Sequence, residues 1–382
     1  MNFRVLGSTK VGYNLPIRDA KIFAGKEAGI CYMPDTIESL FAEDPEKSLK
    51  RAEKTELSGH HSVFGHPTYN FALEEIPKII AMLLNNEKDY NTSEKSARYT
   101  KMKASPEELA VYEKWIGLYK SRILEEYPDM QDKQAEKLAM ENARYLISVF
   151  TPATSMGHTL DFRQLNYILH WMEDYLKNSD ISSFSTLLNP YLQEFTQMFS
   201  EYKEDLLCDG KGRSLSLFGK RERKEEWGEN YCYTYYGTFA QLAQAMRHRT
   251  LKYEVFIPEY EDALFYIPPI IRGTPFENEW LIDLKYLAPR YPQGMLLEIN
   301  ERGTVEDFIL KCKERCCGCA QLEIALQTNE TMQKYLKNTK ASNPQVYKDL
   351  LPYSKGARCT FPDYTCAAPC IWGAKNAFTR KI

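Results

Sequence analysis

The residues best suited to bind a charged ligand stand at the end of a predicted helix, in the sequence Gln244-Ala245-Met246-Arg247-His248-Arg249. Gln244 and Arg247 are three residues apart and therefore share a helical face, whereas Arg249 points elsewhere. An amide and a guanidinium on one face suit a base edge and a phosphate. Periodicity alone favours a simpler interpretation, in which a basic helix C-terminus complements the helix dipole.

A second chemically capable group consists of cysteines late in the sequence. Seven of the ten cysteines are Cys312, Cys316, Cys317, Cys319, Cys359, Cys366 and Cys370. Cys316 and Cys319 have the Cys-x-x-Cys spacing of zinc ligands, and thiolates clustered in a reducing compartment favour zinc over disulfides. Free buried thiols are the alternative. His60, His61 and His66 could also bind a metal, although no nearby carboxylate pair completes a ligand set.

The elements that must position these residues recur in the two halves of the chain. In the first half, residues 68–74 alternate apolar and polar as a half-buried strand does, and a helical run follows over 79–84. In the second half, residues 231–235 alternate in the same way, and a turn with an N-cap at 237–238 precedes a helical stripe over 239–246. Longer helical patterns follow over 162–172 and 305–312. This order predicts a duplicated α+β domain.

The composition fits such a two-domain protein. The chain has 382 residues, of which 43% are hydrophobic and 26% charged, which is enough apolar material for one large core or two ordinary ones. The net charge of −3 gives no bulk field for binding duplex DNA or an anionic membrane. No apolar run reaches the roughly 18 residues of a membrane span, and no basic, apolar leader begins the sequence. We therefore expect a cytoplasmic protein with no nucleic-acid or membrane partner.

Glycine and dense charge of both signs mark a connection near the middle of the chain. It lies between residues 208 and 228. We expect a solvated linker there, between a first domain over 1–207 and a second over 229–382.

Several motifs in fixed order resemble the flavin-dependent thymidylate synthase family. In the first half they are Ser58-Gly59-His60-His61-Ser62-Val63-Phe64-Gly65-His66, Ser93-Glu94-Lys95-Ser96-Ala97-Arg98-Tyr99-Thr100-Lys101, Ala143-Arg144 and Phe162-Arg163-Gln164-Leu165. In the second they are the Gln-x-x-Arg-His-Arg of 244–249, Pro292-Gln293-Gly294, and Arg315 with Ala320-Gln321-Leu322-Glu323-Ile324. The resemblance implies two tandem family-like domains, each an antiparallel sheet with packed helices, that form a pseudo-dimer.

The two halves depart from the family motifs in complementary ways. The first has Asn86-Glu87-Lys88 in place of Arg-His-Arg, and the second has Ile257 and Glu259 in the positions of Ser96 and Arg98. A carboxylate cannot replace a guanidinium that binds a phosphate dianion, because the charge has the wrong sign. Family active sites form between subunits. The resemblance therefore implies one composite substrate site, made of Glu94, Ser96, Arg98 and Arg144 from the first half and Gln244, Arg247 and Arg315 from the second.

The resemblance also implies individual roles. Arg98 and Arg144, with Ser96, would bind the phosphate of dUMP, and the catalytic residues Gln244, Arg247 and Arg315 would address the nucleotide from the other half. Flavin contacts carried over from the family are His60, Ser62, Arg163, Arg247, His248 and Arg249. The reciprocal site, with Asn86, Ile257 and Glu259, is expected to be inactive.

The implied reaction is reductive methylation of dUMP to dTMP, in which NADPH reduces FAD and methylenetetrahydrofolate supplies the carbon. By similarity to some family members, a structural zinc would be bound by Cys317, Cys359, Cys366 and Cys370. Two fused chains would form a homodimer equivalent to the family tetramer. The alternatives are a non-catalytic nucleotide- or flavin-binding protein with a regulatory or scaffolding role, and a flavoenzyme that acts on a different pyrimidine nucleotide.

Overall fold

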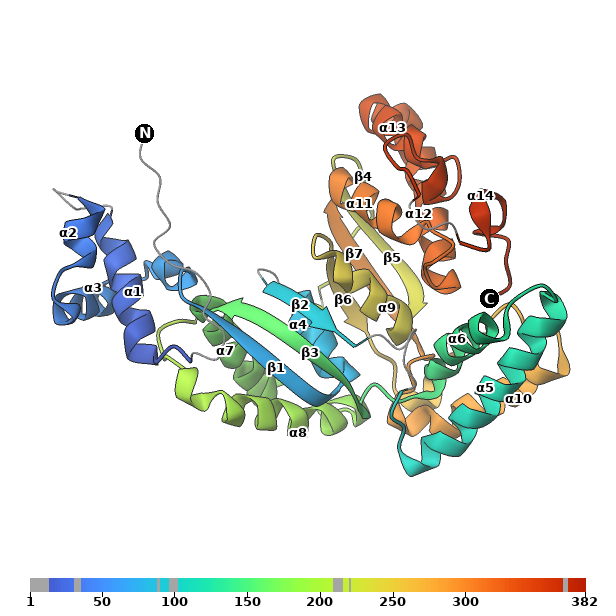
Figure 1. Ribbon diagram of the computed structural model, residues 1–382, viewed down its shortest axis with the longest axis horizontal. Coiled ribbons are helices and arrows are strands. Elements are labelled where there is room, and N and C mark those ends of the chain that lie inside the picture. The colour runs from blue at the N-terminus through green and yellow to red at the C-terminus, as the bar shows by residue number, and fades with distance from the viewer. Residues whose placement is uncertain are drawn as a thin grey trace.

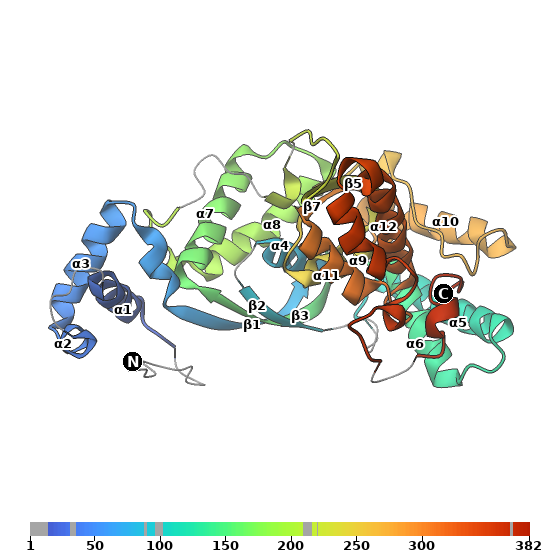
Figure 2. The same cartoon turned by 90° about the horizontal axis from the view of Figure 1, so that it is seen from above.

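A computed structural model describes residues 14–30, 36–87, 90–95, 102–208, 216–219, 221–366 and 370–382 of the chain. These residues form helices around two antiparallel sheets, so the predicted α+β class is confirmed (Figures 1 and 2). Within the described ranges, no helix has the length and apolar character needed to cross a membrane.

The first sheet has the strand order β1-β3-β2. Its strands are β1 (Thr68–Pro77), β2 (Tyr90–Glu94) and β3 (Pro152–Asp161). The helices around it are α4 (Lys78–Asn86), α7 (Phe162–Asn178) and α8 (Ser183–Met198), and an N-terminal group contains α1 (Ile17–Ile30), α2 (Ile37–Phe41) and α3 (Pro45–Leu57). Helix α7 begins where predicted because the Asp161 side chain caps it, accepting a hydrogen bond of 2.6 Å from the Gln164 amide.

The second sheet has the strand order β4-β5-β7-β6. Its strands are β4 (Glu226–Trp227), β5 (Asn230–Thr238), β6 (Lys252–Phe256) and β7 (Leu296–Thr304). Its helices are α9 (Phe239–Ala245), α11 (Val305–Arg315), α12 (Leu322–Ser342), α13 (Pro344–Leu350) and α14 (Gly373–Asn376). Thr238 is the predicted N-cap of α9, whereas Gly237 belongs to strand β5 and not to a turn.

The two sheets repeat one arrangement of elements. In each, a first strand passes directly into a helix, a short strand follows, and a last strand pairs antiparallel between the other two before passing into a second helix. The series is β1-α4-β2-β3-α7 in the first sheet and β5-α9-β6-β7-α11 in the second.

Helices are inserted at the same point of both series, between the short strand and the last strand. The inserted helices are α5 (Pro106–Glu126) and α6 (Asp132–Ala143) in the first and α10 (Pro275–Leu287) in the second. They pack together, because the rings of Trp115 and Trp280 lie edge to face with centroids 4.8 Å apart. The Trp115 indole also donates a hydrogen bond of 2.6 Å to Asp283.

Backbone segments that precede the two last strands lie against each other. Val149 donates to the Tyr291 carbonyl at 3.0 Å, and Gln293 donates to the Ile147 carbonyl at 2.9 Å. The Gly294 amide reaches the Tyr145 carbonyl at 2.7 Å. A Cβ atom at position 294 would stand 2.9 Å from the Tyr145 Cβ, so this close approach requires glycine.

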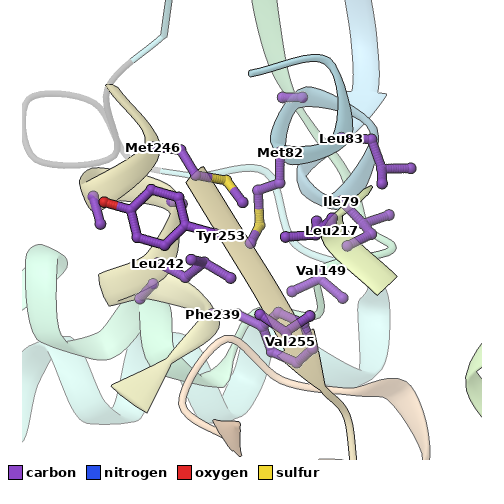
Figure 3. Packing of buried hydrophobic residues seen from close by; sticks show 14 of the residues in the cluster. Ile79, Met82, Leu83, Val149, Leu217, Phe239, Leu242, Met246, Tyr253 and Val255 are labelled. Atoms are coloured by element: carbon purple, nitrogen blue, oxygen red, sulfur yellow. The ribbon is translucent and has the colours of Figure 1, made fainter. Parts of the chain in front are cut away.

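A shared apolar core joins the halves beside these segments (Figure 3). It contains Ile79, Met82, Leu83 and Val149 from the first half and Phe239, Leu242, Met246, Tyr253 and Val255 from the second. Leu217, from the segment expected to be a solvated linker, is fully buried in the same core. Strand β4, at the end of that segment, pairs with β5. The connection therefore contributes to the packing of both sheets.

Candidate active site at the junction of the two sheets

A buried carboxylate lies at the end of β2. The Glu94 side chain is 0% exposed and forms an ion pair with Lys78, the first residue of α4. Thr154 on β3 donates to Glu94 Oε1 at 3.2 Å, and the Asn85 amide reaches Oε2 at 3.4 Å. These three neighbours fix the Glu94 carboxylate, which is therefore a rigid part of the site on the side of the first half.

Two arginines from the second half reach the same strand. Arg247 donates to the Glu94 carbonyl at 3.0 Å. Arg249 donates to Asn91 Oδ1 at 2.9 Å and to the Thr92 carbonyl at 3.2 Å, and its guanidinium stands over the Tyr90 ring. The prediction that Gln244 and Arg247 share a helix is wrong in detail, because α9 ends at Ala245 and Arg247 lies in a 3₁₀ turn over Met246–His248.

One amide oxygen connects the two halves more directly. Gln321 Oε1 accepts hydrogen bonds from Arg144 of the first half and from Gln244 of the second, the latter at 2.6 Å. Arg315 donates to the Gln244 carbonyl at 2.7 Å, and the Gln321 amide donates to the Tyr145 hydroxyl. The junction thus contains two groups of hydrogen-bonded polar residues. Glu94 and Arg247 belong to the first, and Arg144, Gln244 and Arg315 belong to the second.

The electrostatic character of this junction is cationic. Burial lowers the pKa of the Lys78 ammonium, and the nearby Arg247 and Arg144 guanidiniums lower it further against the opposing effect of Glu94. Burial raises the pKa of Glu94, but Lys78 and Arg247 outweigh it and the net direction is down. The excess of positive charge favours the neutral form of Lys78 and the ionised form of Glu94. Such a site is suited to an anionic ligand.

Some polar atoms of the site have no hydrogen-bond partner among the described residues. They are Arg144 Nε and Gln244 Oε1, and the two residues are only 6% and 8% exposed. Buried polar atoms are nearly always paired, with protein, water or ligand. A guanidinium N–H and an amide oxygen match the phosphate oxygens and the N–H groups of a nucleotide.

The reciprocal junction has a different chemistry. Asn86 donates to the Tyr253 carbonyl at 3.4 Å, and Ile257 packs against the hydrophobic core. Glu259 accepts a hydrogen bond of 3.3 Å from the Ser183 amide in the first turn of α8. A carboxylate is favoured at a helix N-terminus, where an arginine would be disfavoured. The reversed charge at position 259 therefore has a local structural reason.

The residues predicted to contact flavin lie in two places. Arg247 and Arg249 are exposed at the junction, whereas the side chain of His248 lies outside the described part. His60 precedes the turn over His61–Gly65, and Ser62 belongs to it; the Phe64 ring of this turn packs against Phe162, which precedes Arg163 in α7. That turn precedes β1, whose first residue pairs with Asp161, while Glu94 pairs with Met156. Five residues of strand, or roughly 17 Å, therefore separate the start of β1 from Glu94, which Arg247 contacts. Arg249 contacts Asn91, which pairs with Thr159 only two residues from Asp161.

Two predicted substrate residues, Ser96 and Arg98, lie outside the described residues. The predicted zinc ligands Cys317, Cys359, Cys366 and Cys370 belong to one region. Burial raises the pKa of the Cys359 thiol, and the other three cysteines raise it further. Across the described ranges, however, no three Cys, His, Asp or Glu side chains are close enough to hold a metal ion. The zinc site predicted at these cysteines is therefore not confirmed and stays a prediction, and no metal-binding group is found at His60, His61 and His66 among the described residues.

Sequence reasoning missed Lys78 as a site residue, and it identified Gln321 only as part of a motif. A signal for Lys78 does exist, because it is the only charged residue in the run Ile76-Pro77-Lys78-Ile79-Ile80. A charged residue inside a run that must be buried needs a partner. Gln321 has no comparable signal, since its role depends on two side chains that come from distant parts of the sequence.

Comparison with known proteins adds an independent finding. A family model described as thymidylate synthase complementing protein matches residues 19–184. The matched range contains the whole first sheet with Glu94 and Arg144, and the Gln-x-x-Arg-His-Arg motif lies beyond it. A search of curated proteins found no match.

Proposed function

Residues 19–184 of the chain belong to the thymidylate synthase complementing protein family, the flavin-dependent thymidylate synthases, and from this premise we propose that the protein methylates dUMP reductively at one composite active site. The proposed site combines Glu94, Ser96, Arg98 and Arg144 with Gln244, Arg247 and Arg315. One observation carries the proposal: Arg144 from the first sheet region and Gln244 from the second donate to the same Gln321 oxygen. Polar groups from both halves therefore converge on one point.

We further propose that the second half is a tandem copy of the first. Its support is the shared order of strand, helix, short strand, inserted helices, last strand and helix around both sheets. In this proposal the domains span 1–207 and 229–382, and the connection between them contributes Leu217 to the shared core. Arg247 and Arg249 would then reach the first domain in the way that arginines of a neighbouring subunit do in the family.

The protein's own residues would bind and orient the nucleotide. Arg144 and Arg98 are suited to its phosphate by charge-assisted hydrogen bonds, and Ser96 adds a hydroxyl donor. Gln244 can pair with a pyrimidine edge through its amide. Arg247, with support from Arg315, would stabilise negative charge that develops on the ring carbonyls during the reaction.

The side chains also fit a dinucleotide flavin. Arg247 and Arg249 are exposed cations beside the junction, and Arg163 stands in the first turn of α7, so phosphate groups would meet positive charge in both places. FAD, when bound, would supply the redox chemistry, with NADPH as its reductant and methylenetetrahydrofolate as the carbon donor. Two copies of the chain would form the assembly equivalent to the family tetramer.

The test is NADPH oxidation by the purified protein with FAD and oxygen as electron acceptor, measured with and without dUMP. We expect dUMP to change the rate, and we expect dTMP to form when methylenetetrahydrofolate is added. Arg247→Ala should lower the dUMP-dependent rate by about 10- to 100-fold, the loss expected for one charged hydrogen bond. Arg18→Ala on α1 is the matched control, because the Arg18 side chain is 55% exposed.

Three other outcomes would contradict parts of the proposal. Flavin and dUMP binding without any turnover would favour a non-catalytic binding protein. Turnover of another pyrimidine nucleotide, but not of dUMP, would favour a flavoenzyme of different specificity. Unchanged dUMP-dependent turnover in Arg247→Ala would reject the composite site.

A further inference from the structure

Lys78 occupies an unusual position for a lysine. It is the first residue of α4, and its side chain is only 15% exposed. A positive charge is disfavoured at a helix N-terminus by the helix dipole. Burying a long cationic side chain also costs solvation. Both penalties act against the charged form, so a compensating interaction must hold this ammonium in place.

Glu94 compensates only part of the positive charge around Lys78. The pair lies within electrostatic range of Arg247 and Arg144, so three cations surround one fixed carboxylate. The other buried carboxylate nearby, Glu323, accepts from the Tyr145 hydroxyl at 2.7 Å and from the Thr238 amide and hydroxyl at 2.9 and 2.8 Å. The cations Lys78, Arg247 and Arg144 thus outnumber the carboxylates Glu94 and Glu323, so this group keeps an excess of positive charge in the described part of the chain.

A second observation points to a ligand at this place. The Nε of Arg144 has no hydrogen-bond partner among the described residues, although Arg144 is almost completely buried. The Nη2 of Arg144 donates to Gln321, whereas its Nε–H can still donate to an oxygen of a ligand. An anion would complete the hydrogen bonding and offset the excess positive charge.

We propose that Lys78 is an additional phosphate-binding residue of the composite site and makes that site select the nucleoside monophosphate over the nucleoside. This inference rests on the proposed function, since it concerns the same nucleotide. Lys78 would use one N–H to hold Glu94 and offer the remaining ammonium donors to the phosphate. Arg144 would bind the same phosphate from the other side.

The experiment compares the binding of dUMP and of deoxyuridine by titration calorimetry. Lys78→Met should weaken dUMP binding by about 10- to 100-fold, as expected for the loss of one charged hydrogen bond, and leave deoxyuridine binding unchanged. Lys78→Arg should retain most of the dUMP affinity. The control is Lys103→Met, because that lysine is 61% exposed and pairs with Glu75 at the surface.

The outcomes separate the two proposals. Wild-type protein that binds no dUMP contradicts the proposed function, and the assignment of Lys78 fails with it. Wild-type binding with equal dUMP affinity in Lys78→Met contradicts the assignment alone. Equal loss for both ligands also contradicts it, because it would mean that Lys78 only positions Glu94. If Lys78→Met does not fold, the double variant Lys78→Met/Glu94→Gln removes both charges, and its selectivity decides in the same way.

Discussion

A buried ion pair inside the second sheet region allows a quantitative prediction. Lys311 on α11 contacts Glu301 on β7, with Nζ 2.7 Å from Oε2 and 3.0 Å from Oε1, and both side chains are 0% exposed. The Tyr231 and Tyr235 hydroxyls donate to the same carboxylate at 3.1 and 3.0 Å. Substituting Lys311 by Met would remove the positive charge and leave the carboxylate buried.

The expected loss follows from this environment. Removing one partner of a buried pair costs about 3–5 kcal/mol. The two tyrosine donors remain and keep Glu301 partly solvated, so the lower end, about 3 kcal/mol, applies to Lys311→Met. For a domain of roughly 150 to 250 residues, each kcal/mol lowers Tm by about 2–4 °C. We therefore expect Tm to fall by about 6–12 °C.

Thermal and urea unfolding followed by circular dichroism would measure the effect. The double variant Lys311→Met/Glu301→Gln should recover at least half of the loss, because it removes the uncompensated charge. Lys313→Met is the control, since its pair with Asp363 is exposed and such pairs contribute about 0–1 kcal/mol. A loss below about 1 kcal/mol in Lys311→Met, or no recovery in the double variant, would refute the reasoning.

Three further predictions concern other parts of the molecule. Burial and the Arg249 cation lower the pKa of His158 to about 4, so between pH 6.5 and 4 the unfolded chain binds a proton at this histidine that the folded protein does not bind. The free energy of unfolding should therefore fall by about 3 kcal/mol between pH 6.5 and 4. His158→Phe should remove this component in urea titrations across that range. Gln321→Leu removes the acceptor of the Arg144 guanidinium and should lower the free energy of unfolding in urea by about 2–3 kcal/mol. An unchanged urea midpoint would show that the Gln321 amide does not connect the two halves. Asp283→Asn weakens the bond to the Trp115 indole and should shift tryptophan emission while lowering Tm by a few degrees, and identical spectra would contradict this.

The local parts of the fold were predictable because their signals are local. Alternation identified β1 and β5, and the 3.6-residue period identified α4, α9, α7 and α11. The inserted helices α5, α6 and α10 were not predicted as a contact between the halves. Their packing depends on Trp115 and Trp280, which lie far apart in the sequence, and no short-range pattern encodes such a contact.

The site shows the same division between local and long-range information. The three-residue spacing brought out Gln244 and Arg247, but their exact geometry depends on Arg249, whose left-handed backbone ends the helical turn. The role of Gln321 could not be derived from spacing, because Arg144 and Gln244 meet there only after the two sheets have packed. A sequence can indicate which groups are chemically capable, whereas the shared acceptor that joins them is a property of the packed chain.

The differences between the two junctions argue for a division of labour, not for simple decay. Glu259 caps the first turn of α8 through Ser183, and Asn86 donates to the Tyr253 carbonyl, so both departures from the family motif contribute to structure. A carboxylate that stabilises a helix N-terminus could not be exchanged for a phosphate-binding arginine without cost. If the second half is a tandem copy, as proposed, the two junctions are free to diverge, because a substitution affects only one of them. Cations would then be retained where Arg144 and Arg247 stand, and helix capping would be improved at the other junction.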